Sequence, residues 1–467
     1  MSVVNANWPR ESAETESLRR PTKRGAPDVH DRMLTGGSAH VNWQTQSAVT
    51  IMADVTEGNL DALRSVLDEI AADVPGNRVM PLGKLDGTHF ARFFVTDALE
   101  SPGGTRIPAH LVFMSDFDGS ADAHLEHLTN VGGDGMDELF GHCVAYPAAR
   151  PVDRADRVAY LKRNVVAGGV RYVNTIGKTS RQIRAEAELY EAIEDFLDLK
   201  REQLKAKDAR GARGAVIEFV SGEPSLRWAL TPAPRPPLGY RLRETAHFAG
   251  PLVVALVLLP IALPALVVWL LVLRAHESGD PAPLVRPDAA HLAKLRSLED
   301  HGAQNQFTAL GFVKPGRFRA ATASAVLQLI GFGARHIFNN GNLAGVKTIH
   351  FARWIPLDGG ARIVFCSNYD GSTESYMDDF IDKVAWGLNA TFSNAVGYPL
   401  TRWLIFRGAN NEEAFKGFLR AHQLPTQVWY AAYPATTALN IRAHARVRAG
   451  LSGEVSEKEA QAWLRLL

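Results

Sequence analysis

The chain is poor in cysteine and carries almost no net charge, and both shortages exclude classes of protein. Cys143 and Cys366 are the only cysteines among 467 residues, so neither a disulfide framework nor a cysteine-based zinc site is expected, and a reducing compartment is indicated. The 51 lysines and arginines balance 50 aspartates and glutamates, so the basic excess of a general nucleic-acid binder is missing. The length predicts two or three domains.

Several common catalytic motifs are also missing. No glycine-rich stretch follows a predicted strand with the spacing of a nucleotide-binding loop, no histidine pair has zinc-protease spacing, and no serine lies in a nucleophile elbow. We therefore predict no metal site and no nucleic-acid partner.

Charge is absent from one long segment, Phe248–Leu273, which holds 26 consecutive uncharged residues. A straight helix of that length reaches about 39 Å, beyond the roughly 30 Å of a bilayer's hydrocarbon core, so we predict membrane contact. Pro251, Pro260 and Pro264 interrupt the segment. They are compatible with a kinked spanning helix or with a re-entrant hairpin bent at Leu259–Pro264.

The flanks of this segment predict its orientation. Proline-rich tethers, Thr231–Gly239 and Gly279–Asp288, precede and follow it, and the excess of arginine on the preceding side favours a cytoplasmic location for that side. Residues 1–43 are polar and charged, without a secretory signal, which predicts a disordered tail. We expect a protein of the cell inner membrane whose folded domains are cytoplasmic.

The sequences on either side of the segment repeat each other. The tetrapeptide HFAR occurs at residues 89–92 and again at 350–353, and VFMSDFDGS at 112–120 matches VFCSNYDGS at 364–372. Three shorter matches follow in the same order: Tyr146-Pro147 with Tyr398-Pro399, 170–172 with 428–430, and 183–185 with 441–443. We infer an internal duplication.

Hydrophobic periodicity predicts the same element order in both copies. The first copy has strands at 47–55, 88–96 and 107–115 and a helix at 60–72. The second has strands at 305–313, 347–355, 362–367, 403–407 and 428–433, and helices at 318–337, 373–388 and 412–422. This β-α-β-β-α-β order is the ferredoxin-like pattern of the α+β class. Because such a sheet has one bare face, two tandem copies are expected to pack sheet to sheet.

Duplicated sheets of this kind resemble the dimeric α+β barrel superfamily, which includes dye-decolourising peroxidases and chlorite dismutases. The resemblance covers residues 45–200 and 304–449. The stretches SNYDGSTESYMDDFI and VWYAAYP are also similar to a group of bacterial membrane-associated proteins. The resemblance implies an intrachain barrel with an inserted membrane segment. Packing of the copies on each other favours the hairpin; the competing arrangement is a single span in which each half meets a partner chain as a homo-oligomer.

These observations divide the chain into seven segments. They are a disordered tail (1–44), a first ferredoxin-like repeat (45–210), a linker (211–247), the membrane segment (248–273), a second linker (274–302), a second repeat (303–450) and a C-terminal helix (451–467).

The peroxidase resemblance also implies site residues. That family carries a G-x-x-D-G motif whose aspartate assists peroxide cleavage beside haem; Asp370 occupies the aspartate position, while Ser367 replaces the first glycine. The family's distal arginine would be Arg402, and the axial ligand could be His336, His350, His422 or His444. The competing interpretation is structural: an Asp-Gly-Ser turn between a strand and a helix is an ordinary N-cap.

The second HFAR strand adds further candidates. Strict alternation would place His350 and Trp354 on one face and Arg353 on the other, so His350 and Arg353 could not line one pocket. We take Asp370, Arg402 and His350 as catalytic candidates, and His336, Arg353 and Trp354 as haem-binding candidates. Alternatively, the repeated histidine and arginine serve the fold in both copies.

Three functions remain open at this point. The first is a membrane-anchored, haem-dependent, peroxidase-like oxidoreductase acting on a small apolar or aromatic substrate, which the concentration of tryptophan in the second copy would suit. The second is a non-catalytic membrane-associated module that binds lipid or a partner. The third is a cofactor-free monooxygenase on the same barrel.

Overall fold

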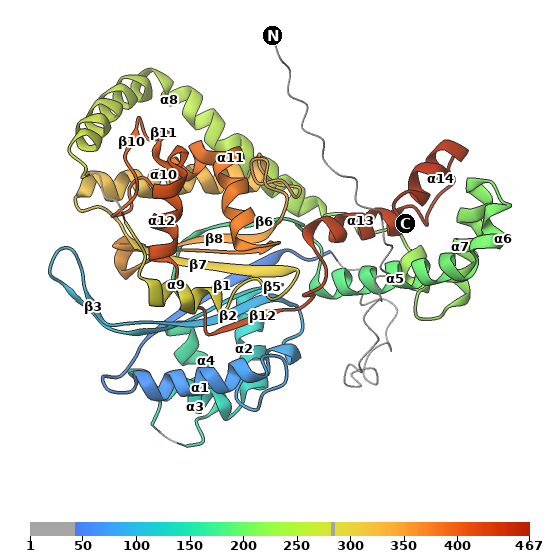
Figure 1. Cartoon of the computed structure of the whole chain (residues 1–467), viewed down its shortest axis with the longest axis horizontal. Coiled ribbons are helices and arrows are strands. Elements are labelled where there is room, and N and C mark those ends of the chain that lie inside the picture. Colours follow the sequence, from blue (N-terminus) through green and yellow to red (C-terminus); the bar gives the residue numbers. More distant parts are fainter. Residues whose placement is uncertain (1–42, 149, 282–284) are drawn as a thin grey trace, which may run out of the picture. The chain divides into compact units, whose positions relative to one another are not determined.

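The computed structural model describes residues 43–148, 150–281 and 285–467, so nearly all of the predicted tail lies outside the described residues. The fold is α+β, with antiparallel sheets and one long apolar helix (Figure 1). We call the residues before that helix the first half and those after it the second half.

Two four-stranded sheets form the centre of the fold. Their orders are β1-β5-β2-β12 and β6-β8-β9-β7, and all neighbours are antiparallel. The first sheet comprises β1 (Gln46–Asp54), β5 (His110–Asp118), β2 (Thr88–Thr96) and β12 (Val428–Ala431). The second comprises β6 (Val170–Val173), β8 (Ile349–Leu357), β9 (Arg362–Asp370) and β7 (Gln304–Phe312). Each sheet therefore takes three strands from one half of the chain and its fourth strand from the other half.

The exchange of the fourth strand has a local cause before β6. The chain first runs beside β1, where the Val166 amide donates to the Thr50 carbonyl at 2.9 Å. Gly168 and Gly169 then adopt φ of 84° and 103°, which glycine reaches without a Cβ clash, and the chain enters the other sheet beside β8. In the second half, the Leu424 amide donates to the Thr308 carbonyl at 2.8 Å before β12 joins β2.

Helices cover the outer faces of both sheets (Figure 1). The first outer face carries α1 (Leu60–Ala72), α2 (Ala121–Gly132), α3 (Gly135–Phe140) and α4 (Arg154–Arg163). The second carries α10 (Arg317–His336), α11 (Thr373–Phe392) and α12 (Glu412–His422). The short α9 (Ala289–Arg296) lies beside α12, where His291 bonds the Arg420 carbonyl.

A separate helical cluster has its own apolar core. It is formed by α5 (Ser180–Leu199), α7 (Ala209–Gly222), α13 (Ala438–Ala449) and α14 (Glu457–Leu464), with α6 (Arg201–Lys205) between α5 and α7. Since α5 and α7 come from the first half and α13 and α14 from the second, this cluster is also shared between the halves.

The inner faces of the sheets pack on each other through apolar side chains. Phe94, Val112 and Met114 of the first sheet form one buried cluster with side chains of the second, among them Ile355 and Val364. At roughly 25 cal/mol per Å² of buried apolar area, such a face contributes strongly to stability. The bare side of each sheet is thus covered within one chain.

Two buried arginines cross this interface in opposite directions. Arg92 of β2 is 2% exposed and donates to carbonyl and side-chain oxygens of the opposite sheet. Its acceptors are the Phe307 carbonyl (2.9 Å), Thr308 Oγ1 (2.7 Å), Gln306 Oε1 (3.2 Å), the Ser367 carbonyl (3.1 Å) and Asn368 Oδ1. Because the acceptors belong to β7 and β9, Arg92 joins the first half to the second.

Arg353 of β8 makes the reciprocal contacts with the first half. It donates to the Val49 carbonyl at 3.0 Å, Thr50 Oγ1 at 2.6 Å and the Ser115 carbonyl at 3.4 Å. The two HFAR arginines therefore have a structural role.

The apolar segment forms part of a single helix, α8 (Leu238–Ser278), of 41 residues. The predicted hairpin bend is not found: the helix continues through Pro251, Pro260 and Pro264 and is visibly curved (Figure 1). Prolines remove backbone donors on one side of a helix and bend it. Only 6% of its most apolar stretch is buried.

One predicted strand, residues 403–407, is wrong. The chain instead forms the hairpin β10 (Thr401–Arg402) and β11 (Phe406–Arg407), and Trp403 and Leu404 have positive φ. Their amides both donate to the carboxylate of Glu277 at 2.8 Å, and Glu277 is 3% exposed. A buried charge at the end of α8 thus requires a turn where periodicity indicates a strand. A second hairpin, β3 (Leu99–Glu100) with β4 (Arg106–Ile107), lies in the first half.

We expect Arg92→Ala to destabilise the protein by about 3 kcal/mol, because it leaves several buried oxygens without a donor. Thermal or denaturant unfolding of the full chain in detergent measures this loss. Arg402→Ala, at an exposed arginine, is the matched control and should change stability by less than about 0.5 kcal/mol. Equal effects of the two substitutions would contradict the role assigned to Arg92.

Candidate functional site

Two of the predicted site residues are in direct contact. His350 Nε2 lies 2.6 Å from Asp370 Oδ1, and both side chains are buried. The second oxygen, Asp370 Oδ2, accepts the amide of Ala438, the first residue of α13, at 2.8 Å. Both carboxylate oxygens are therefore engaged in joining the end of β9 to the start of a helix.

The first half contains the same arrangement. His89 Nε2 lies 3.0 Å from Asp118 Oδ1, and Asp118 Oδ2 accepts the amide of Ser180 at the start of α5 at 2.9 Å. A pair that occurs in both halves and anchors the same kind of helix start supports the structural interpretation. In addition, the following serines cap α2 and α11, where Ser120 and Ser372 accept backbone amides.

The expectation from strict alternation is wrong at the histidine. The pairing of β8 with β9 shifts between Ile349 and Phe351, which makes His350 a bulge residue. His350 consequently packs near Phe90 and Tyr433, at ring-centroid distances of 5.4 and 6.0 Å, in the same region as Phe351. Alternation fails because a bulge adds one residue to a strand and inverts the pattern beyond it.

The other predicted residues lie elsewhere. Arg402 is exposed on the β10–β11 hairpin, and His336 lies at the end of α10 against α8. Trp354 is buried in the core under α10–α12, with its ring 5.1 Å from Phe365. Arg353 lies between the sheets.

These positions do not fit a haem site. Such a site needs an accessible histidine nitrogen, a cation and an acid around one apolar cavity. His350 is 1% exposed and bonded to Asp370, while Arg402 and His336 are on other elements. The six residues therefore do not form one centre.

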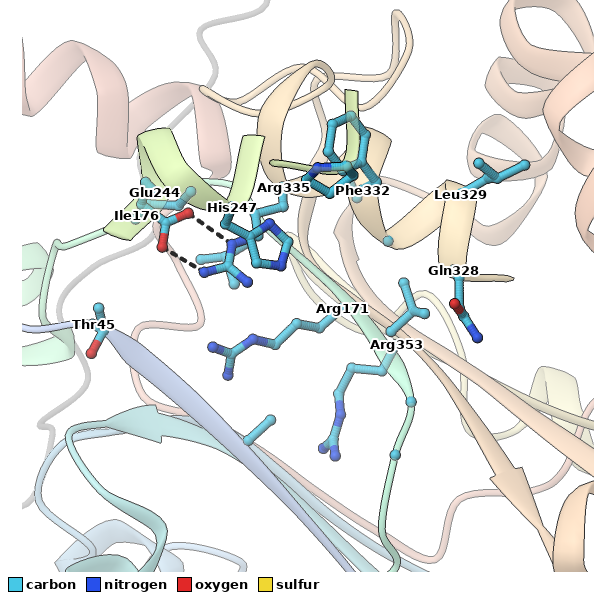
Figure 2. A pocket seen from close by; sticks show the side chains of 18 of the residues that line it. Thr45, Arg171, Ile176, Glu244, His247, Gln328, Leu329, Phe332, Arg335 and Arg353 are labelled. Atoms are coloured by element: carbon cyan, nitrogen blue, oxygen red, sulfur yellow. Dashed lines mark hydrogen bonds and ion pairs between the residues drawn. The ribbon is translucent and has the colours of Figure 1, made fainter. Parts of the chain in front are cut away.

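A large cavity lies at a different place, at the edge where β1 and β6 meet α8 and α10. Its volume is about 1230 Å³. Four arginines line it, Arg171, Arg243, Arg335 and Arg353, against the single carboxylate of Glu244. Figure 2 shows Arg171, Arg335 and Arg353 together with Glu244. The lining is therefore strongly positive.

Most of these charges have partners. Glu244 and Arg335 form an ion pair, with Arg335 Nε 2.7 Å from Glu244 Oε2. Arg353 bonds to the first sheet and lies 3.9 Å from Asp116 Oδ1. Burial raises the pKa of the Asp116 carboxyl, and the positive charge of Arg353 opposes that rise.

Arg171 is the exception. It is the direct cross-strand neighbour of Arg353, so two like charges share one face of the sheet. The structure shows no hydrogen bond or ion pair for its guanidinium among the described residues. The Arg171 side chain is exposed, and the charges that act on it are the carboxylate of Asp116 and the guanidinium groups of Arg353 and Arg335. Such a group favours an anion.

Sequence reasoning missed this cavity, although a signal was present. Within the repeated V-x-Y motif, Arg171 stands where the second copy has Trp429. A charged residue in one copy of a matched motif, opposite an apolar residue in the other, indicates that the two copies differ in function or packing there. The motif was used only for the residues that the copies share, so this difference was missed.

Two histidines join α8 to α10 beside the cavity. His247 Nδ1 lies 2.8 Å from His336 Nε2, which requires that at least one ring offers an unprotonated nitrogen. Desolvation, with the positive charge of His247 and Arg335, lowers the pKa of His336, and Glu244 opposes this shift. The contact therefore favours the neutral form of His336.

Comparisons with known proteins identify no relative: no family model, curated protein or solved structure matches the chain.

We expect the contact of α8 with α10 to loosen as the pH falls. Because the pKa of His336 is lower in the docked state than the usual value of about 6.5, docking is stabilised above that value and weakens below it. Hydrogen exchange of residues 240–250, measured at pH 7.5 and 5.5, should show faster intrinsic-rate-corrected exchange at the lower pH. In the His336→Phe variant this difference should disappear; a difference of wild-type size there would exclude the histidine pair as its cause.

Proposed function

We propose that the protein is a non-catalytic, membrane-associated module that binds lipid, with α8 lying in the interface of one membrane face. The observation that carries this proposal is that the exposed apolar stretch of α8 has both of its ends fastened to the same folded body. Residues along the middle of the helix, such as Leu256, Val257 and Ile261, are 71–74% exposed.

The beginning of α8 is fastened to the end of α10. The Glu244–Arg335 ion pair and the His247–His336 contact lie there, and the ring of Phe248 stacks on Phe332 at 5.8 Å. A partly buried, bidentate arginine–carboxylate pair of this kind is stronger than an exposed one.

The end of α8 is fastened at two further places. Trp269 Nε1 donates to Thr322 Oγ1 of α10 at 3.2 Å, and Glu277 accepts two amides of the β10–β11 hairpin. Directly after the helix, Asp280 accepts from Lys314 Nζ and Arg319 Nη2, both at 2.7 Å.

This fastening and the exchanged strands argue for an in-plane helix. Since β6 and β12 each belong to the sheet of the other half, the two halves share one side of any membrane. A helix that crossed once would separate them. A curved helix whose apolar middle faces the hydrocarbon and whose ends return to the same body meets both requirements. The arginines before the segment favour the cytoplasmic leaflet.

We infer that the scaffold consists of two tandem ferredoxin-like repeats packed as an intrachain dimeric α+β barrel. The element order, the antiparallel sheets packed inner face to inner face and the reciprocal arginines support this inference. The exchange of β6 and β12 is the feature by which the scaffold departs from two self-contained repeats.

The peroxidase-like alternative has little support in the geometry. Asp370 and His350 bond each other and the start of α13, and Arg402 is exposed on another element, the β10–β11 hairpin. The third alternative, a cofactor-free monooxygenase, predicts no particular residue that the structure could support. Lipid binding uses the two features that the fold does not otherwise explain, the exposed apolar helix and the positive cavity.

Vesicle flotation of the full chain tests the role of α8. We expect Ile261→Glu to lower binding to neutral phosphatidylcholine vesicles at least tenfold, because burying a carboxylate in hydrocarbon costs about 2–3 kcal/mol. The matched control is Leu199→Glu, which places the same charge at a leucine 80% exposed on α5. The proposal is falsified if wild type fails to float, or if the two variants float equally.

A spectroscopic test separates this proposal from the haem-dependent one. Protein produced with a full haem supply should show no Soret band, and Asp370→Asn should change thermal stability without changing the visible spectrum. A stoichiometric Soret band that Asp370→Asn or His350→Ala alters would restore the peroxidase-like function.

A further inference from the structure

Because the two halves repeat each other, the cavity can be compared with the equivalent site in the other half. The site around Arg353 between β8 and β1 corresponds to the site around Arg92 between β2 and β7. The correspondence is set by matched contacts: Arg353 bonds the Val49 carbonyl and Thr50 Oγ1, and Arg92 bonds the equivalent groups of Phe307 and Thr308. Any further difference between the two sites is therefore a change on a common frame.

The site around Arg92 is filled by side chains of its own. Trp429, the cross-strand neighbour of Arg92, donates from Nε1 to Asn368 Oδ1 at 3.0 Å. Thr426 Oγ1 donates to Gln306 Oε1 at 3.0 Å, and Arg92 also donates to that oxygen. This site is a closed network whose polar groups satisfy one another.

The site around Arg353 is open at the equivalent positions. Ala48 replaces Gln306, Gly168 replaces Thr426 and Arg171 replaces Trp429; all three line the cavity. Three side chains that close one site are thus absent from the other. Two charges also differ, because Arg171 stands where the second copy has Trp429 and Asp116 stands where it has Asn368. One site is therefore packed and the other opens into the cavity, where Arg171 is exposed and makes no hydrogen bond or ion pair among the described residues.

The cavity also has an apolar side. Leu252 and Ala255 of α8 line it together with Leu329 and Phe332 of α10, and Leu252 belongs to the exposed apolar stretch of α8. Figure 2 shows Leu329 and Phe332 on the α10 side and the long side chains of Arg171 and Arg353 on the strand side. A cavity with one charged wall and one apolar wall suits an amphiphilic ligand.

We propose that this cavity binds the phosphate headgroup of an anionic lipid at Arg171, with the acyl chains lying between α8 and α10 and continuing into the membrane. The inference rests on the membrane association proposed above and names the ligand class for it. Arginine presents a planar set of donors that matches phosphate oxygens, and several arginines around one cavity suit a group with more than one charged oxygen. Arg335 and Arg243 pair with Glu244, and Arg353 lies 3.9 Å from Asp116, which leaves Arg171 as the lining arginine without an ion pair among the described residues.

Titration calorimetry of the full chain in neutral detergent tests the ligand class with three probes. They are dioctanoyl phosphatidic acid, dioctanoyl phosphatidylcholine and inorganic phosphate. We expect phosphatidic acid to bind at least tenfold more tightly than either of the others. Equal binding of inorganic phosphate would assign the cavity to a free phosphate and overturn the lipid; equal binding of phosphatidylcholine would overturn the anion site.

Two variants test the residue. Arg171→Gln removes the charge, and Arg171→Trp introduces the side chain that fills the corresponding site; each should weaken phosphatidic acid binding at least tenfold. Arg402→Gln, which removes an exposed arginine elsewhere, should not. Thermal midpoints of all variants show whether they fold. If a folded Arg171→Gln binds phosphatidic acid as wild type does, the inference is overturned.

The two proposals fail separately. If the wild-type protein floats on neutral vesicles but shows no preference for phosphatidic acid, the membrane association stands and the headgroup site is wrong. If the wild-type protein binds dioctanoyl phosphatidic acid in detergent but does not float, the headgroup site stands and the role proposed for α8 is wrong.

Discussion

The reciprocal crossing of the two sheets is the constraint on which the rest of the structure depends. Arg92 and Arg353 each leave their own sheet and satisfy buried carbonyls of the other, while β6 and β12 exchange places at the sheet edges. Neither half can separate without stranding a buried guanidinium and the oxygens it serves, which costs more than an exposed ion pair would. The halves therefore behave as one body.

This constraint decides what the long apolar helix can do. Because the two halves form one folded body, the helix that joins them must begin and end on that body. If the helix contacts a membrane, both of its ends therefore lie on the same side of that membrane. The structure meets that requirement with a curved α8 fastened by Glu244 at one end and Glu277 at the other. Its exposed middle is then a surface that water disfavours and a bilayer interface suits.

Duplication also explains how a binding site could arise without disturbing the fold. The frame of HFAR arginines and capped helices is the same in both halves, so each copy can tolerate changes that the other does not share. Replacing a closed set of side chains by Ala48, Gly168 and Arg171 opens one site and leaves its counterpart intact. The open site is the one next to α8.

By itself, the sequence determined the α+β class, the repeated motifs, most strands of the two sheets and the position of the apolar segment, because repeats, periodicity and uncharged runs are local properties. Only the tertiary structure decided which sheet receives residues 170–173, since an extended segment has the same pattern beside either partner. It also decided that His350 lies in a bulge, that Asp370 accepts a backbone amide at the start of α13, and that Arg171 lines a cavity with no hydrogen bond or ion pair among the described residues. Those outcomes depend on which distant groups are neighbours, and spacing along the chain does not contain that information.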